Sequence, residues 1–213
     1  NLVPENYPNV VYYNGPGGLQ AQHVQGMPLL SLGVLHQGRE VSLQTNLMGR
    51  YNAENILAAC CVGLHMGITM ESVIRAVQSY RPQNNRSQYI DTGKNKLYMD
   101  AYNANPSSMR AAIDEFLLSD DQDKLMILGE MRELGDDSAR EHAGIIAYLR
   151  ERGITRAICI GKSFEELIQQ TGFLYFDNTD QLIEHLERTV PVGQFIFTKG
   201  SRSNRLEKAV PYL

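Results

Sequence analysis

The segment DAYNANP, at residues 100–106, brings an acidic residue, a phenol and two amides together in a short stretch. The preceding residues 96–99 read as a short buried strand, and residues 106–118 read as an amphipathic helix. Pro106 suits the first helical turn, and Asn105 is a good N-cap. Side chains at the carboxyl end of a strand occupy the place where open α/β sheets bind ligands. The segment therefore predicts a ligand site, with a well-capped strand–helix turn as the alternative.

A second pair of amides opens a predicted helix, in the segment GRYNAEN at residues 49–55. Asn52 and Asn55 are three positions apart, so both side chains project from one face of the first turn. An amide can both donate and accept hydrogen bonds, which matches the edge of a purine such as adenine. The alternative interpretation is an asparagine N-cap with a second asparagine on the surface.

Further polar groups follow other predicted strands and the joint between the two halves of the chain. Arg86 lies just past that joint, where its planar guanidinium could bind a phosphate, although a lone loop arginine is usually a solvated charge. Three polar loops follow strands, at residues 128–135, 161–163 and 198–202. Because parallel strands end at one edge of a sheet, we expect these loops to lie beside Asp100 and to share a substrate cleft.

The sequence GKS at residues 161–163 invites comparison with a phosphate-binding loop because it follows a strand. The full pattern needs a glycine where Arg156 stands, so the sequence predicts an ordinary strand-to-helix turn here. His142, on the first turns of a predicted helix at the same edge, is isolated, and an isolated histidine is more often structural than catalytic. The sequence contains no H-E-x-x-H motif and no serine-nucleophile elbow.

Composition restricts the classes of protein to which the chain can belong. Its 213 residues are 43% hydrophobic and 21% charged, which is typical of a folded globular protein. A net charge of −4 without a basic stripe argues against nucleic acid as a partner, and no apolar stretch reaches membrane-spanning length. The three cysteines lack metal-ligand spacing, so we predict no metal site and reduced cysteines in the core of a cytoplasmic protein.

The order of predicted elements changes near residues 80–85. The first half shows β-hairpin patterns over residues 10–46 and helices at 50–66 and 70–80, and it reads as the end of a larger domain. In the second half strands and helices alternate, which predicts an α/β fold with a mainly parallel sheet and helices on both faces. The predicted strands there are 89–92, 97–100, 124–128, 157–160, 173–176 and 194–198, and the predicted helices are 106–118, 138–152, 163–170, 179–188 and 203–209.

Several segments occur in an order that resembles the Mur ligases. They are NNRSQ at 84–88, DAYNANPSSM at 100–109, LGEMRELG at 128–135 and KGSR at 199–202, and residues 49–55 are similar to the G-x-H-N-x-x-N signature of that family. The likeness covers about residues 10–209. One departure is Tyr51, which stands where the signature has histidine, so a role specific to imidazole is in doubt, whereas a ring stacked near adenine would survive.

The resemblance implies a three-domain, ATP-dependent ligase. Residues 1–82 would be the C-terminal part of its central ATP-binding domain, and residues 83–213 its complete Rossmann-like C-terminal domain. The phosphate loop, the Mg²⁺ ligands and a carbamylated lysine would lie upstream, so this segment alone is expected to be inactive. The implied reaction adds D-alanyl-D-alanine to UDP-N-acetylmuramoyl-tripeptide through an acyl phosphate, as a step of peptidoglycan precursor synthesis.

The resemblance also implies roles for individual residues. Asn52 and Asn55 would flank the adenine of ATP, Arg86 would reach the phosphates and Asp100 would bind the ribose hydroxyls. The pocket for the amino substrate would be formed by Tyr102, Asn103, Asn105, Glu130, Met131, Leu134, Lys199, Ser201 and Arg202. No catalytic residue is assigned within this segment.

Two other functions stay open from the sequence. Another ligase of the same superfamily, similar to folylpolyglutamate synthetase, would share the architecture but should lack the loops typical of the ligase that adds D-alanyl-D-alanine. A stand-alone nucleotide-binding module without catalysis is the second, and an upstream G-x-x-G-K-[ST] motif in the full-length gene would exclude it.

Overall fold

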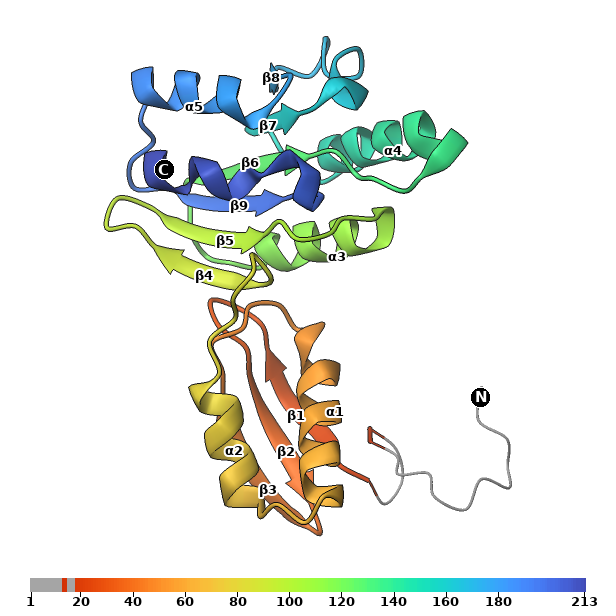
Figure 1. The fold of residues 1–213 in the computed structure, drawn as a ribbon, viewed down its shortest axis with the longest axis vertical. Coiled ribbons are helices and arrows are strands. Elements are labelled where there is room, and N and C mark those ends of the chain that lie inside the picture. Colours follow the sequence, from red (N-terminus) through yellow and green to blue (C-terminus); the bar gives the residue numbers. More distant parts are fainter. Residues whose placement is uncertain (1–12, 15–17) are drawn as a thin grey trace. The chain divides into compact units, whose positions relative to one another are not determined.

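A computed structural model describes Tyr13, Asn14 and residues 18–213. These residues form two compact units that divide between Arg81 and Pro82. Residues 1–12 and 15–17, where the predicted hairpin region begins, lie outside the described residues. Among the described residues, no helix has the length and apolar character needed to cross a membrane. Figure 1 labels the helices and strands of both units.

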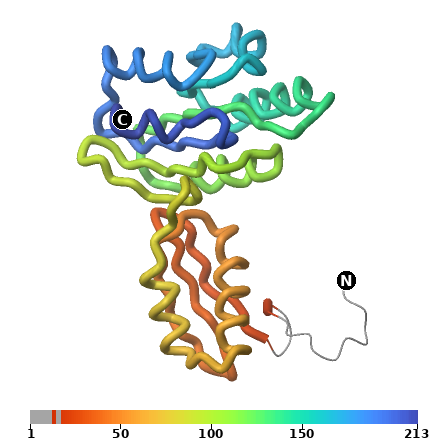
Figure 2. The backbone as a smooth tube through the Cα atoms, in the orientation of Figure 1, coloured from red at the N-terminus to blue at the C-terminus, as the bar shows by residue number. Residues whose placement is uncertain are grey.

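The first unit is built on an antiparallel meander of three strands (Figure 2). These are β1 (Gln20–Gln25), β2 (Ser31–His36) and β3 (Arg39–Gln44). The β2–β3 turn consists of Gln37 and Gly38, and both have positive φ angles, as a type I′ hairpin turn requires. The predicted hairpin is therefore confirmed.

Two helices pack on this meander, α1 (Asn52–His65) and α2 (Met70–Ser79). Gly67, with φ of 81°, ends the first helical segment, and the Thr69 side chain caps the second by accepting from the Ser72 amide. The helices predicted at residues 50–66 and 70–80 are therefore confirmed, with ends that differ by at most two residues. The core joins apolar residues of the strands to one face of α1, and its members are Leu19, Leu30, Leu32, Val34, Leu43, Ala53, Ile56, Leu57, Cys60, Cys61 and Val73.

The second unit contains a six-stranded sheet with the order β4-β5-β9-β6-β7-β8. The strands are β4 (Gln88–Asp91), β5 (Lys96–Asp100), β6 (Lys124–Gly129), β7 (Ala157–Ile160), β8 (Leu174–Phe176) and β9 (Phe195–Lys199). Only the edge strand β4 runs antiparallel to its neighbour, so the predicted α/β fold with a mainly parallel sheet is confirmed. Every residue of β7 and β9 is buried, which explains why these strands read as unbroken apolar runs.

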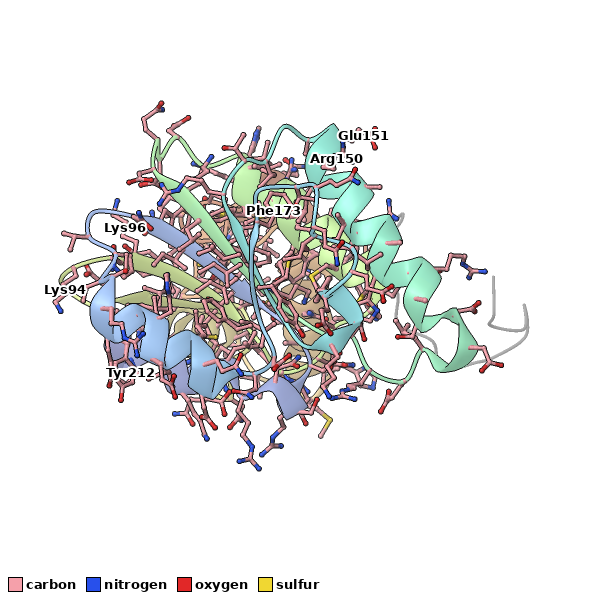
Figure 3. The ribbon with its side chains drawn as sticks, turned by 90° about the horizontal axis from the view of Figure 1, so that it is seen from above. Lys94, Lys96, Arg150, Glu151, Phe173 and Tyr212 are labelled. Atoms are coloured by element: carbon pink, nitrogen blue, oxygen red, sulfur yellow. The ribbon has the colours of Figure 1, made fainter. Side chains whose placement is uncertain are left out.

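Helical segments cover both faces of this sheet. On one face, Phe116 of α3 (Pro106–Leu117) packs against Phe195 and Phe197 of β9, and α3 contacts α4 (Ser138–Glu151). Ile196 points to the other face, where α5 (Thr179–Arg188) and the 3₁₀ segment η4 (Leu206–Tyr212) complete the core. In Figure 3 the labelled end of α4 lies far from Tyr212 of η4, as expected for segments of opposite layers.

Two predicted helices are absent as α-helices. Residues 163–170 form a short 3₁₀ segment, η2 (Lys162–Phe164), followed by turns. Residues 203–209 are divided between η3 (Arg202–Asn204) and η4, because Arg205 has left-handed backbone angles (φ 54°, ψ 39°) that interrupt the helix. Both departures follow strands at the edge of the sheet where the site residues lie.

Candidate functional site at the carboxyl edge of the sheet

The carboxyl ends of β5, β9, β6 and β7 bring the predicted polar loops to one edge of the second unit. Backbone hydrogen bonds join these loops directly. The Arg202 amide donates to the Tyr102 carbonyl over 3.1 Å, and the Ser201 amide donates to the Glu130 carbonyl over 3.1 Å. The expected common edge is therefore confirmed, and the loop after β9 lies between the loops after β5 and β6.

An ion pair between Asp100 and Lys199 lies at the centre of this edge. The two residues are register partners on β5 and β9, and Lys199 Nζ donates to Asp100 Oδ2 over 2.5 Å. The lysine is only 2% exposed, and its ammonium also donates to the Asn103 carbonyl over 3.3 Å. The second carboxylate oxygen of Asp100 accepts from the Ser87 amide over 3.3 Å. This carboxylate is thus held in place from both sides, with its side chain 15% exposed.

Two guanidinium groups lie close to the ring of Tyr102. Arg86 lies over the ring at 3.7 Å from its centroid, and Arg202 lies 5.7 Å from the same centroid. Tyr102 is half-buried, whereas both arginines are exposed. The structure thus brings together one residue predicted to bind phosphate and two predicted for the amino-substrate pocket.

Glu130, at the end of β6, binds the turn that follows β7. Its Oε1 accepts from both the backbone amide and the hydroxyl of Ser163, each over 2.8 Å, and its Oε2 lies 3.2 Å from the Arg132 guanidinium. Gly161 has φ of 111°, and a Cβ there would come within 2.3 Å of Glu130 Cγ. The Glu130 carboxylate accepts the hydrogen bond that the Ser163 amide would donate to a bound phosphate. This agrees with the prediction that residues 161–163 are not a phosphate loop.

His142 has a structural role in the same region. Its Nε2 accepts from the Met131 amide over 3.0 Å, and its Nδ1 lies 2.7 Å from the Ser138 carbonyl. The ring thus connects the backbone of Met131 to that of Ser138. The imidazole is fully buried and fixes the loop after β6 to α4. Met131, predicted for the amino-substrate pocket, is itself buried there.

The remaining pocket residues contribute mostly through local structure. Asn105 caps α3 by accepting from the Ser108 amide in a capping box, and the Asn103 side chain accepts from the Ala104 amide. Leu134 is half-buried at the start of the 3₁₀ segment η1 (Gly135–Asp137). The Ser201 hydroxyl accepts from the Arg132 amide over 3.0 Å.

Asn204 also belongs to this edge, since its side-chain amide donates to the Glu130 carbonyl over 2.9 Å, although it is not among the predicted site residues. The sequence predicts a helix over residues 203–209 that includes Asn204, and no local pattern shows that the left-handed backbone of Arg205 interrupts it. Ser163 and Arg132 lie within the predicted polar loops, but the sequence did not indicate that both contact Glu130.

The two asparagines of the first unit form a chain of their own at the start of α1. Asn52 is buried and donates to the Met48 carbonyl over 2.8 Å, and Asn55 donates to the Asn52 side-chain oxygen over 3.0 Å. Tyr51, rather than an asparagine, is the N-cap residue, and it forms no side-chain cap hydrogen bond. Asn55 is exposed, so its amide is the accessible end of this chain.

Two cavities of the second unit lie at the opposite edge, near the amino ends of the strands. One has a volume of about 330 Å³ and is lined by residues of β7, β8 and α5, including Ile158, Leu174 and Leu186. The other, of about 190 Å³, lies beside Lys124 and Arg156. Neither includes a predicted site residue. Within residues 13–14 and 18–213, no group of three His, Cys, Asp or Glu side chains could hold a metal ion.

Comparison with known proteins gives one family. The model of the glutamate ligase domain of the Mur ligases matches residues 85–202. The UDP-N-acetylmuramoyl-tripeptide–D-alanyl-D-alanine ligase of Treponema pallidum is 29% identical over 214 residues, which cover 97% of this chain and 46% of that protein. The chain thus spans about half the length of the curated relatives it matches.

Solved structures give the same fold. A crystal structure of MurF from Acinetobacter baumannii has a TM-score of 0.81 at 24% identity, and the match covers 93% of this chain and 46% of that one. The structure of MurF ligase from Thermotoga maritima in complex with ADP has a TM-score of 0.71 at 20% identity, covering 92% of this chain and 45% of that one.

Proposed function

Because the chain belongs to the Mur ligase family, we propose that it is part of an ATP-dependent ligase that adds D-alanyl-D-alanine to UDP-N-acetylmuramoyl-tripeptide. Support comes from the names of the relatives, which describe this activity. The observation that carries the proposal at the level of residues is the gathering of Asp100, Tyr102 and two arginines at one sheet edge. An acid and cations in one place suit a substrate that has both hydroxyl and anionic groups.

We assign the two units to different parts of that ligase. Residues 1–82 are the C-terminal part of the central ATP-binding domain, and residues 83–213 are the C-terminal domain. ATP and Mg²⁺ are the cofactors of the proposed reaction, and the metal ligands belong to the upstream part. Bound Mg²⁺ would offset the charge on the phosphates during transfer.

For the nucleotide-binding residues we propose the roles that the family resemblance implies, and the chemistry of each side chain supports them. The Asn55 amide is accessible for the adenine edge, and Asn52 orients it through their mutual hydrogen bond. The Asp100 carboxylate binds ribose hydroxyls, and its position is fixed by Lys199 and the Ser87 amide. Arg86 binds a phosphate through its fork of N–H groups while its face rests on Tyr102.

The loops after β5, β6 and β9 form the pocket for the amino substrate. Ser201 and Glu130 fix two of these loops to each other, and Lys199 contributes by holding the Asn103 carbonyl and Asp100. The protein's contribution to the reaction is to position the substrate amine and to stabilise negative charge on the transferring groups.

Steady-state kinetics of the full-length protein test the proposal. Phosphate release from ATP should require both the tripeptide substrate and D-alanyl-D-alanine. Asp100→Ala should lower kcat/KM for ATP about ten- to hundred-fold, because a charge-assisted hydrogen bond contributes roughly 1.5–3 kcal/mol. Lys162→Ala is the matched control and should leave kcat/KM unchanged. Turnover that does not depend on the dipeptide, or a loss confined to Lys162→Ala, would contradict the proposal.

A further inference from the structure

The cations at the carboxyl edge of the sheet differ in whether a carboxylate faces them. Lys199 is paired with Asp100, and Arg132 lies 3.2 Å from Glu130. Arg86 and Arg202 form no ion pair with a carboxylate of the described part of the chain. Two positive charges therefore stand without a partner at the same edge, and both lie at the ring of Tyr102.

The ring of Tyr102 alone does not explain this arrangement. A cation over an exposed aromatic ring gains only about 0.5–1 kcal/mol, and two guanidinium groups near one ring repel each other. An anion bound to each guanidinium would offset that repulsion and would receive charge-assisted hydrogen bonds from the N–H groups of its arginine.

The backbone holds the three residues in this arrangement. The Arg202 amide donates to the Tyr102 carbonyl, so the loop after β9 cannot shift without the loop after β5. The neighbouring Ser201 amide donates to Glu130, which ties Arg202 to the loop after β6. The backbone of Arg202 is therefore held between the loops after β5 and β6, which both belong to the proposed amino-substrate pocket.

We propose that Arg202 binds the free carboxylate of the amino substrate, with Tyr102 as the positioning residue that holds Arg202 beside Arg86. This inference rests on the proposed function. A dipeptide that reacts through its amine keeps its terminal carboxylate, which is the anion that the pocket must recognise. Arg86 would bind a phosphate and Arg202 this carboxylate. The Tyr102 ring, which contacts both arginines, would then set the distance between the phosphate group and the amino substrate.

A substrate lacking the carboxylate tests the assignment in the full-length enzyme. The wild type should use D-alanyl-D-alanine about ten- to hundred-fold better, in kcat/KM, than D-alanyl-D-alaninamide, which keeps the amine but loses the charge. Arg202→Ala should lower kcat/KM for the dipeptide by that same factor and leave the value for the amide unchanged. Comparing both acceptors in the wild type and in Arg202→Ala, as in a double-mutant cycle, measures the contact between this guanidinium and the substrate carboxylate.

Two further variants separate this contact from general damage. Arg205→Asn removes the same charge three residues away and keeps a residue type that tolerates the left-handed backbone, so the preference for the carboxylate should survive. Tyr102→Phe should keep the preference, whereas Tyr102→Leu should weaken it mainly through KM for the dipeptide.

The outcomes are distinct. If Arg202→Ala still prefers the dipeptide over the amide by the wild-type factor, the inference is overturned. If Arg202→Ala raises KM for ATP and affects both acceptors equally, Arg202 binds a phosphate and the inference is also overturned. A wild type that ligates both acceptors equally contradicts the inference while the proposed function stands, and a wild type that ligates neither overturns both.

Discussion

Lys199 and Asp100 lie 99 residues apart in the chain and meet across 2.5 Å at the ends of two adjacent parallel strands. The pair lies beside the loops that follow those strands, and the Lys199 side chain is 3% exposed and the Asp100 side chain 15% exposed. A buried charge without a partner is costly, so each of these residues depends on the other. The pair therefore connects the stability of the second unit to the position of a carboxylate in the candidate site.

Replacing Lys199 by Met should destabilise the second unit by about 3 kcal/mol, because it leaves Asp100 buried without its counter-ion. Urea unfolding of the purified chain measures this change. Adding Asp100→Leu to the same variant should restore much of the lost stability. Lys96→Met is the matched control: Lys96 lies 3.3 Å from Asp121 but is 54% exposed, so its loss should cost less than about 1 kcal/mol. If Lys199→Met and Lys96→Met lowered the free energy of unfolding equally, the buried pair would contribute no more to stability than the exposed pair.

Gly161→Ala should destabilise the chain by about 2 kcal/mol or more, for two reasons. The residue has φ of 111°, and the new Cβ would overlap Glu130 Cγ at 2.3 Å, which would displace the carboxylate from Ser163. Gly153→Ala is the comparison, since Gly153 also has positive φ (71°) but has open space at the Cβ position. Thermal unfolding of both variants separates the effect of backbone strain from that of the clash with Glu130. If Gly153→Ala were as unstable as Gly161→Ala, the clash would not explain the loss of stability.

The stability of the second unit should fall between pH 9 and pH 11, in part because of Cys159. Burial raises the pKa of the Cys159 thiol from 9.0 to about 12. In this range the unfolded chain loses the thiol proton while the folded chain keeps it, so the free energy of unfolding decreases as pH rises. The contribution of this thiol should be about 2 kcal/mol over these two pH units. Urea unfolding of the wild type and of Cys159→Ala at each pH should give a smaller slope for the variant, and identical slopes would contradict the assignment.

Residues 82–213 should fold without the preceding unit, because their sheet and both helical layers are complete within that segment. The first unit should be the less stable of the two. Native-state hydrogen exchange of the whole chain measures both, and we expect amides of β6 and β9 to be protected longer than those of β2 and α1. Equal protection lost in one cooperative step would instead indicate a single folding unit.

The sequence by itself determined the elements whose signals are local. The Asn105 cap, Pro106 and the apolar stripe of α3 follow one another directly in the chain, so the start of this helix could be predicted and is observed. The buried apolar run of β7 and the alternation of strands and helices can also be read directly along the chain, and they predicted the mainly parallel sheet. Because parallel strands share one carboxyl edge, the sequence also predicted which loops would lie together.

Only the tertiary structure decided which side chains are partners and where local propensity is overridden. Residues 163–170 have a helical pattern, but Glu130 captures Ser163 and the buried Phe164 packs edge-on against His142, so a 3₁₀ turn forms instead. The pairing of Lys199 with Asp100 and the two arginines at Tyr102 likewise join residues that are distant in the chain. Such contacts depend on the order of strands in the sheet, above all on the insertion of β9 between β5 and β6, and no local pattern specifies that order.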